Sequence, residues 1–136
     1  MNEKLTTKEK IISWIFQIIA AAILALAAYG KFSGEEFGTI VFERIKMGAA
    51  GKNLIGVIES MAVFLLLTPN LPHYGAILGF GTMLGALLAH LTVLGIVVNN
   101  DGGKAVMMLL TVITSCSVVM YIRRKNLPFI GGTIEE

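Results

Sequence analysis

The chain has 136 residues, of which 55% are hydrophobic and 15% are charged, and its formal net charge is +2. Soluble domains carry roughly a quarter of their residues as charged side chains, so this composition is typical of an integral membrane protein, and the length favours a single domain over residues 1–136. The weak net charge excludes a basic nucleic-acid-binding face, and the single cysteine, Cys116, excludes an internal disulfide and a CxxC redox pair.

The first apolar segment runs from Ile11 to Tyr29 and predicts a membrane-spanning helix over about residues 11–30. Lysines precede it, so a cleaved secretory signal is the alternative. The polar Gln17 interrupts the apolar run and favours a helix that is retained.

The connection from Lys31 to Lys52 is amphipathic. Phe37, Val41 and Ile45 recur every four residues, and most charged residues fall between them. This pattern predicts a short amphipathic helix that lies in the membrane interface, or a re-entrant segment that folds back over the bundle. A solvated loop is the alternative.

Three further apolar segments predict spans over about residues 51–67, 74–98 and 104–122. The turns between them contain the prolines of "TPNLPH" and the glycines of "NNDGG", residue types that end helices. The predicted fold class is therefore all-α: an integral membrane four-helix bundle with a short amphipathic interfacial helix or re-entrant segment between the first two spans.

The distribution of basic residues predicts the orientation. An even number of spans puts both termini on one side, and the 11 lysines and arginines divide into six on that side and five on the other. This excess is small, but "RRK" directly follows the last span. The positive-inside rule then favours a multi-pass protein of the plasma (inner) membrane with both termini in the cytoplasm.

Helical periodicity places several polar residues of the spans on faces that also carry glycine and alanine, which are the faces where membrane helices touch. Counting along the helices puts Lys31, Glu59, His90 and Thr111 in the same half of the membrane. The predicted ligand-binding residues are Gln17, Tyr29, Lys31, Glu59, His90 and Thr111.

Glu59 needs a partner, because an unpaired ionised side chain near the bilayer centre costs about 3 kcal/mol. We predict that Glu59 and His90 form a hydrogen-bonded pair, with Lys31 nearby, in a small polar pocket open toward the side opposite the termini. The alternative is a structural clamp that fixes the helices without binding a ligand. The histidine and cysteine spacings fit no metal site.

The ordered motifs resemble the DoxX family of small four-span membrane proteins. They are "YGKF" at the end of the first span, "LIGVIES" in the second, "GAILGFGTMLGALLAHLTV" in the third and "DGG" before the fourth. The resemblance covers roughly Ile12 to Lys125. It implies a four-helix bundle in which Lys31, Glu59 and His90 correspond to the family's recurrent polar positions.

The resemblance also implies a function. Members are associated with quinone-linked oxidation of sulfur compounds, as subunits beside a catalytic partner, and more distant relatives are assembly chaperones. We therefore expect a membrane accessory subunit of a redox system, with a quinone as the candidate ligand and a larger membrane or redox protein as partner.

Other functions stay open at this point. They are a membrane-protein assembly chaperone, a lipid- or small-molecule-binding protein without catalysis, and a small-molecule transporter. Glycine pairs in the third span also suit a homo-oligomer. The chain departs from one DoxX-like branch, linked to disulfide formation in a partner enzyme, because it supplies no dithiol. The sequence contains no complete catalytic set, so it leaves open whether the protein is an enzyme.

Overall fold

The computed structural model describes residues 5–126, which form helices joined by short turns. Within this part of the chain four helices are long and apolar enough to cross a membrane: α1 (Thr7–Ser33), α3 (Gly48–Leu67), α4 (Pro72–Ala89) and α5 (Lys104–Ile122). The short helix α2 (Glu36–Arg44) joins α1 to α3, the π-helical turn η1 (His90–Leu94) continues α4, and the 3₁₀ turn η2 (Arg124–Asn126) follows α5. The predicted all-α fold with four membrane helices and a short helix after the first is confirmed.

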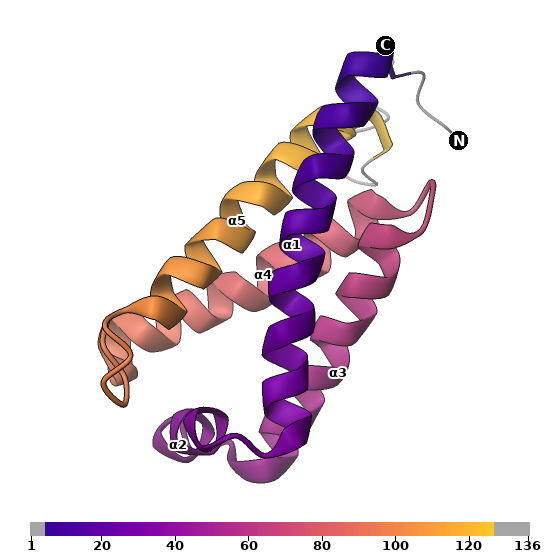
Figure 1. Cartoon of the computed structure of the whole chain (residues 1–136). Helices are drawn as coiled ribbons and strands as arrows, with labels where there is room; N and C mark the ends of the chain where they lie inside the picture. Colours follow the sequence, from indigo (N-terminus) through magenta and orange to yellow (C-terminus); the bar gives the residue numbers. More distant parts are fainter. Residues whose placement is uncertain (1–4, 127–136) are drawn as a thin grey trace.

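The four long helices form an antiparallel bundle in which α1 packs on α3 and α5, and α4 packs on α3 and α5 (Figure 1). The start of α1 and the end of α5 lie at one end, called here the terminal face. Helix α2 and the α4–α5 turn lie at the opposite end, called here the α2 face. Toward the α2 face the α4–α5 pair inclines away from the α1–α3 pair.

Helix α1 is longer than the predicted span, because polar residues extend both of its ends. The Thr6 hydroxyl accepts a hydrogen bond from the Glu9 backbone N–H (3.1 Å), and the Glu9 carboxylate accepts one from the Thr6 N–H (3.0 Å). This capping box starts the helix before its apolar run. At the other end Gly34 takes a left-handed conformation (φ 79°) that ends the helix.

The prediction that the third span continues to residue 98 is wrong. The α4 helix gives way to the π-helical turn η1, and Gly95 then adopts φ 79°, which breaks the helix. The turn that follows is organised by Asp101, whose carboxylate accepts hydrogen bonds from the backbone N–H groups of Val98 (3.1 Å), Gly103 (2.9 Å) and Ala105 (3.1 Å). Asp101 thereby caps the start of α5.

The α3–α4 interface depends on a glycine. A methyl group added at Gly75 would lie 2.6 Å from the backbone nitrogen of Leu66 and 2.8 Å from the carbonyl oxygen of Ala62, so only glycine permits this approach. In contrast, a methyl group at Gly81 or Gly85 would meet no atom of the described structure within 4 Å. Gly75 therefore lies at the α3–α4 contact inside the bundle, whereas Gly81 and Gly85 face outward.

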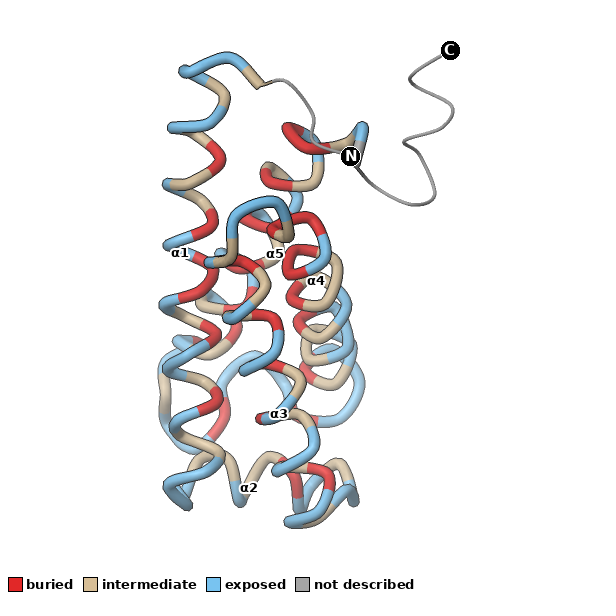
Figure 2. The backbone as a smooth tube through the Cα atoms, turned by 90° about the vertical axis from the view of Figure 1, so that its right-hand side faces the viewer, coloured by how far each residue is buried: buried red, intermediate tan, exposed pale blue. Residues whose placement is uncertain are grey.

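The outer surface of the bundle is apolar. Figure 2 shows exposed and buried positions alternating around each long helix, and large apolar side chains such as Leu26, Phe64, Leu88 and Met107 are more than half exposed. Such a surface is stable in contact with lipid, since it matches the apolar bilayer interior. The chain is a multi-pass membrane protein whose outer surface contacts the lipid bilayer.

Candidate functional site

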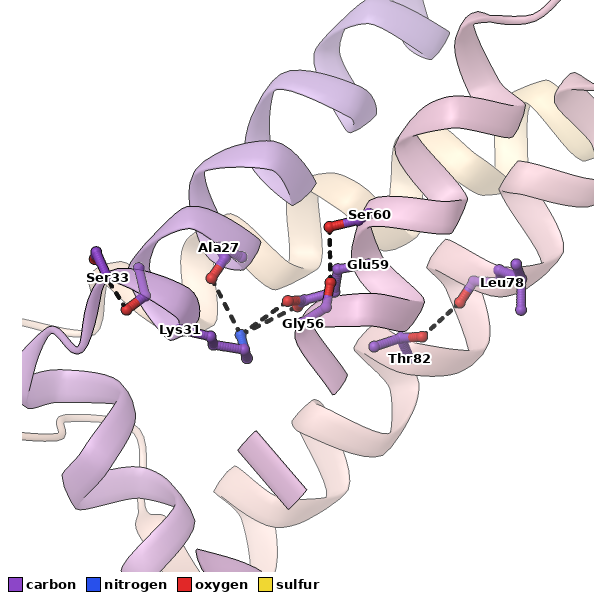
Figure 3. A network of polar contacts seen from close by, with 9 residues as sticks. Ala27, Lys31, Ser33, Gly56, Glu59, Ser60, Leu78 and Thr82 are labelled. Atoms are coloured by element: carbon purple, nitrogen blue, oxygen red, sulfur yellow. Dashed lines mark hydrogen bonds and ion pairs between the residues drawn. The ribbon is translucent and has the colours of Figure 1, made fainter. Parts of the chain in front are cut away.

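A buried ion pair joins α1 to α3 near the α2 face. The Nζ atom of Lys31, in the last turn of α1, lies 3.0 Å from Oε1 and 3.2 Å from Oε2 of Glu59 (Figure 3). The Glu59 side chain is 0% exposed and that of Lys31 is 16% exposed. The predicted proximity of Lys31 to Glu59 is therefore present in the structure, and the two residues are called here the Lys31–Glu59 pair.

Two further groups hold the Lys31 ammonium. Its Nζ atom donates to the Ala27 carbonyl oxygen at 3.5 Å and lies 5.9 Å from the centroid of the Phe42 ring. Phe42 is the one described residue of α2 that is buried. Helix α2 therefore folds back over the bundle, and its aromatic ring covers the ammonium in a cation–π contact.

The two carboxylate oxygens of Glu59 differ in their bonding. Oε2 accepts a hydrogen bond from Lys31, whereas Oε1 is held by charge alone: within the described part of the chain no donor meets it with hydrogen-bond geometry, although it is buried. A buried carboxylate oxygen without a hydrogen bond is costly. Oε1 can thus accept a hydrogen bond from a ligand.

The predicted hydrogen bond between Glu59 and His90 is wrong. Among residues 5–126, the Glu59 carboxylate contacts Lys31, and Nδ1 of His90 lies 2.8 Å from the carbonyl oxygen of Gly95. Both residues are buried as expected. However, Glu59 points to Lys31 of α1 and not to α4 (Figure 3). The His90 ring bonds to its own chain, at Gly95, where the helix breaks. Since a carbonyl oxygen only accepts, Nδ1 donates, and a neutral His90 keeps Nε2 as an acceptor.

Tyr29 and Thr111 face outward, so their predicted place in an interior pocket is wrong. Tyr29 is 67% exposed. Thr111 is also exposed, and its hydroxyl donates to the Met107 carbonyl oxygen of its own helix (2.9 Å). The prediction from helical periodicity placed both residues in the interior, but each lies about a quarter turn or more from the buried face of its helix.

Gln17 is buried as predicted, but it belongs to a second polar cluster near the terminal face. Nε of Arg123 donates to Oγ of Ser13 (2.9 Å), which donates to Oε1 of Gln17 (2.5 Å). Nε2 of Gln17 in turn donates to the carbonyl oxygen of Leu66 (2.8 Å). Leu66 is in the last turn of α3, where carbonyl groups lack partners within the helix. Gln17 therefore supplies a hydrogen bond to a carbonyl group at the end of α3. Both the oxygen and the nitrogen of its side-chain amide are hydrogen-bonded.

Three residues of these clusters were not among the site residues predicted from the sequence. Phe42 lies off the Phe37–Val41–Ile45 stripe, so the apolar pattern of α2 did not select it. Ser13 sits one turn before Gln17, a spacing that could have linked them. Arg123 directly follows the last span and was counted as a surface charge, although it is only 8% exposed.

The site contains no metal cluster: across residues 5–126, no group of three or more His, Cys, Asp or Glu side chains could hold a metal ion. Its chemistry is that of one fully buried carboxylate and one partly exposed ammonium that lies against an aromatic ring.

Fold and site together define a small multi-pass membrane protein, a four-helix bundle with a buried ion pair beneath an interfacial helix. No protein-family model matches the chain, and the searches of curated proteins and of solved structures returned no match.

Proposed function

We propose that this protein is a membrane accessory subunit of a redox system, and that its Lys31–Glu59 pair binds the head of a quinone. The observation that carries the proposal is the geometry of the pair. A partly buried ammonium lies beside a fully buried carboxylate oxygen, Oε1, that makes no hydrogen bond within the described residues.

The pair offers complementary groups to both redox forms of a quinone. The Lys31 ammonium can donate to a quinone carbonyl oxygen, and Oε1 of Glu59 can accept from a quinol hydroxyl. Both bonds are charge-assisted and form in a water-poor site, which makes them stronger than bonds between neutral groups. The chain would bind and orient the head, and a catalytic partner subunit would supply the electrons.

The resemblance to the DoxX family supports the accessory role, because its motifs carry both members of the pair: "YGKF" contains Lys31 and "LIGVIES" contains Glu59. His90, the third recurrent polar position, lies at the end of α4 with its Nδ1 bonded to Gly95. Its contribution in this chain is to shape the helix end and not to pair with Glu59.

A melting experiment tests the proposal. Several quinones, with and without isoprenoid tails, are added to the purified protein, and the shift in melting temperature is compared between wild type and Glu59→Gln. Glu59→Gln removes the charge but keeps the shape. We expect at least one quinone to raise the melting temperature of the wild type only. The absence of any shift across the quinones would refute quinone binding.

A second candidate function is that of an assembly chaperone that holds a transmembrane helix of a partner protein. The outward-facing Gly81 and Gly85 favour it, since glycines four residues apart let a second helix approach closely. Cross-linking in native membranes would then trap one recurrent larger protein, and the adduct would be lost in Gly85→Ile. Recovery of only self-adducts would instead indicate a homo-oligomer.

We further infer that the terminal face lies in the cytoplasm and that the membrane is the plasma (inner) membrane. Exposed basic residues at that face, including Lys8, Lys10 and Lys125, support this orientation. A single cysteine placed at Lys125 in a Cys116→Ser background should be blocked by a permeant thiol reagent but not by an impermeant one applied from outside. Labelling from outside would reverse the orientation.

A further inference from the structure

The Lys31–Glu59 pair is closed to a ligand in this structure. The Glu59 side chain is 0% exposed, and its Oε1 meets no hydrogen-bond donor with suitable geometry in the described part of the chain. A ligand can therefore reach Oε1 only if a group beside the pair moves. Lys31 and Glu59 lie on α1 and α3, which share the packed core of the bundle, so separating these two helices would disrupt the core. Helix α2 is the third element in contact with the pair.

Helix α2 lies against the pair at two positions. The centroid of the Phe42 ring is 5.9 Å from Nζ of Lys31. A methyl group added at Gly38 would lie 4.0 Å from Cα of Lys31 and 3.6 Å from Cδ of Lys52, so the α2 backbone passes close to both lysines. Helix α2 therefore covers the ammonium from the α2 face of the bundle (Figure 1).

Few interactions fix α2 to the rest of the bundle. All nine of its residues are described, and Phe42 is the one that is buried. Within residues 5–126, its one side-chain hydrogen bond to another element joins Glu36 to Asn99, an exposed contact at 3.4 Å. No side chain caps the start of α2. Segments with so few buried contacts open at a lower free-energy cost than packed helices, so α2 is the element beside the pair that can move most easily.

Left-handed residues flank α2 on both sides. Gly34 precedes it with φ 79°, and Lys46 and Gly48 follow it with φ 63° and 65°. A methyl group added at either glycine would meet no atom of the described structure within 4 Å, so neither position is held by packing. Glycine turns at the ends of an element can absorb the backbone rotation of a hinge. Helix α2 can thus swing as a unit while α1 and α3 stay in place.

We propose that α2 is a hinged lid over the Lys31–Glu59 pair and that Phe42 is the side chain that closes it. The proposal rests on the head-binding function proposed above and adds the entry route. When α2 swings out, the Phe42 ring leaves the ammonium, and the quinone head enters from the α2 face. A quinone carbonyl oxygen then takes the place of the ring beside Lys31. Closure of α2 afterwards shields the bound head from water.

Carboxyl labelling of the full-length protein tests the lid without any quinone. A water-soluble carbodiimide with excess glycine ethyl ester modifies carboxyl groups that it can reach, and mass spectrometry follows Glu59, with a Lys31–Glu59 amide counted as modification. We expect slow modification in the wild type and a rate several-fold higher in Phe42→Ala. Phe37→Ala, at a half-buried position of the same helix, is the matched control and should stay close to the wild-type rate. The exposed Glu43 should react equally in all three proteins.

A reversible lock tests the same motion without removing Phe42. Gly38→Cys and Lys52→Cys, in a Cys116→Ser background, place two thiols on facing positions of α2 and α3. A short thiol cross-linker that reducing agents cleave then bridges them. We expect the bridge to stop the modification of Glu59 and reduction to restore it, with the unbridged double variant as the control.

The outcomes separate the lid from the head site. Modification of Glu59 that neither the bridge nor Phe42→Ala changes would overturn the lid, and so would a Glu59 that stays unmodified in both the wild type and Phe42→Ala. A Glu59-dependent melting shift with quinone that persists in the bridged protein would overturn the lid and leave the head site standing. A lid that responds as expected, in a protein whose melting temperature no quinone shifts, would overturn the head site alone.

Discussion

The two residues of the Lys31–Glu59 pair are not equivalent, because one can reach water and the other cannot. Lys31 is 16% exposed and lies in the last turn of α1, whereas Glu59 is 0% exposed and lies in the middle of α3. If Glu59 is neutralised, the long Lys31 side chain can extend toward the α2 face and be hydrated. If Lys31 is removed, Glu59 keeps a buried charge or must take up a proton.

We therefore expect Lys31→Met to destabilise the protein more than Glu59→Gln. The first should cost about 3 kcal/mol, as for a buried charge that loses its partner, and the second about 1 kcal/mol, as for a lost hydrogen bond. Thermal unfolding in detergent measures both, with the exposed Lys104→Met as the control for losing a lysine. The double variant Lys31→Met/Glu59→Leu should recover part of the loss. Equal single costs that add in the double variant would contradict the buried pair.

At the scale of the elements, the contacts of the glycines in α4 predict opposite effects of the same substitution. Gly75→Ala places a methyl group against the backbone of α3, and we expect a loss of about 1–3 kcal/mol, as for an overpacked core. Gly81→Ala places the same group in open space and should stabilise α4 by up to about 1 kcal/mol through helix propensity. Chemical or thermal unfolding in detergent compares them. A Gly75→Ala variant as stable as Gly81→Ala would show that α3 and α4 do not approach so closely.

The cap of α5 predicts a pH dependence. Burial acts to raise the pKa of the Asp101 carboxyl, but its hydrogen bonds to the backbone N–H groups of Gly103, Ala105 and Val98 outweigh burial, and the pKa lies below its ordinary value of 3.8. A lowered folded-state pKa means that the stabilisation by Asp101 is complete above pH 3.8 and is lost as the pH falls through the lower folded-state value.

Asp101→Ala should therefore cost about 1 kcal/mol at pH 7, and the difference from wild type should shrink once the pH is below the folded-state pKa. Thermal unfolding at pH 7 and near pH 3 measures it, with the exposed Glu43→Ala as control. A cost that does not change with pH would show that the carboxylate charge is not what caps α5.

The elements also show what the sequence could and could not predict. The bounds of spans one, two and four were predicted to within a few residues, because a membrane helix follows a long apolar run in the sequence. The third span was predicted too long, since its apolar run continues past Gly95, and the conformation of one glycine ends the helix. Glu59 and Lys31 were predicted to lie close because both depth and face follow from helical geometry. Whether Glu59 pairs with Lys31 or with His90 depends on which neighbouring helix it faces. The periodicity of one helix identifies its buried face but not which helix packs against that face.

At the scale of the whole molecule, two polar clusters lie at different depths with apolar residues between them. The Lys31–Glu59 pair is near the α2 face, and the Ser13–Gln17–Arg123 cluster is near the terminal face. The residues of α1 and α3 between them that are at most 5% exposed are Ala20, Ala21, Leu24, Ala28 and Ala62. Within the described part of α1 and α3, tightly packed small apolar residues therefore separate the two clusters.

This layer predicts that the protein does not conduct protons, which bears on the transporter alternative. Proteoliposomes that contain the protein should hold an imposed pH gradient as long as empty liposomes, when followed with an internal pH dye. Ala62→Asp, which places a polar group in the layer, is the comparison variant. A gradient that collapses faster with the wild type, and equally in Glu59→Gln, would show a route through the bundle that the packing does not account for.

The most direct test of the Lys31–Glu59 site is native mass spectrometry of the protein purified in mild detergent, with wild type beside Glu59→Gln and Lys104→Met. We predict an added mass that corresponds to a quinone on the wild type and on Lys104→Met, and its loss in Glu59→Gln. A ligand-free mass for all three proteins, or an added mass that Glu59→Gln retains, would contradict the account and leave the pair as a structural clamp between α1 and α3.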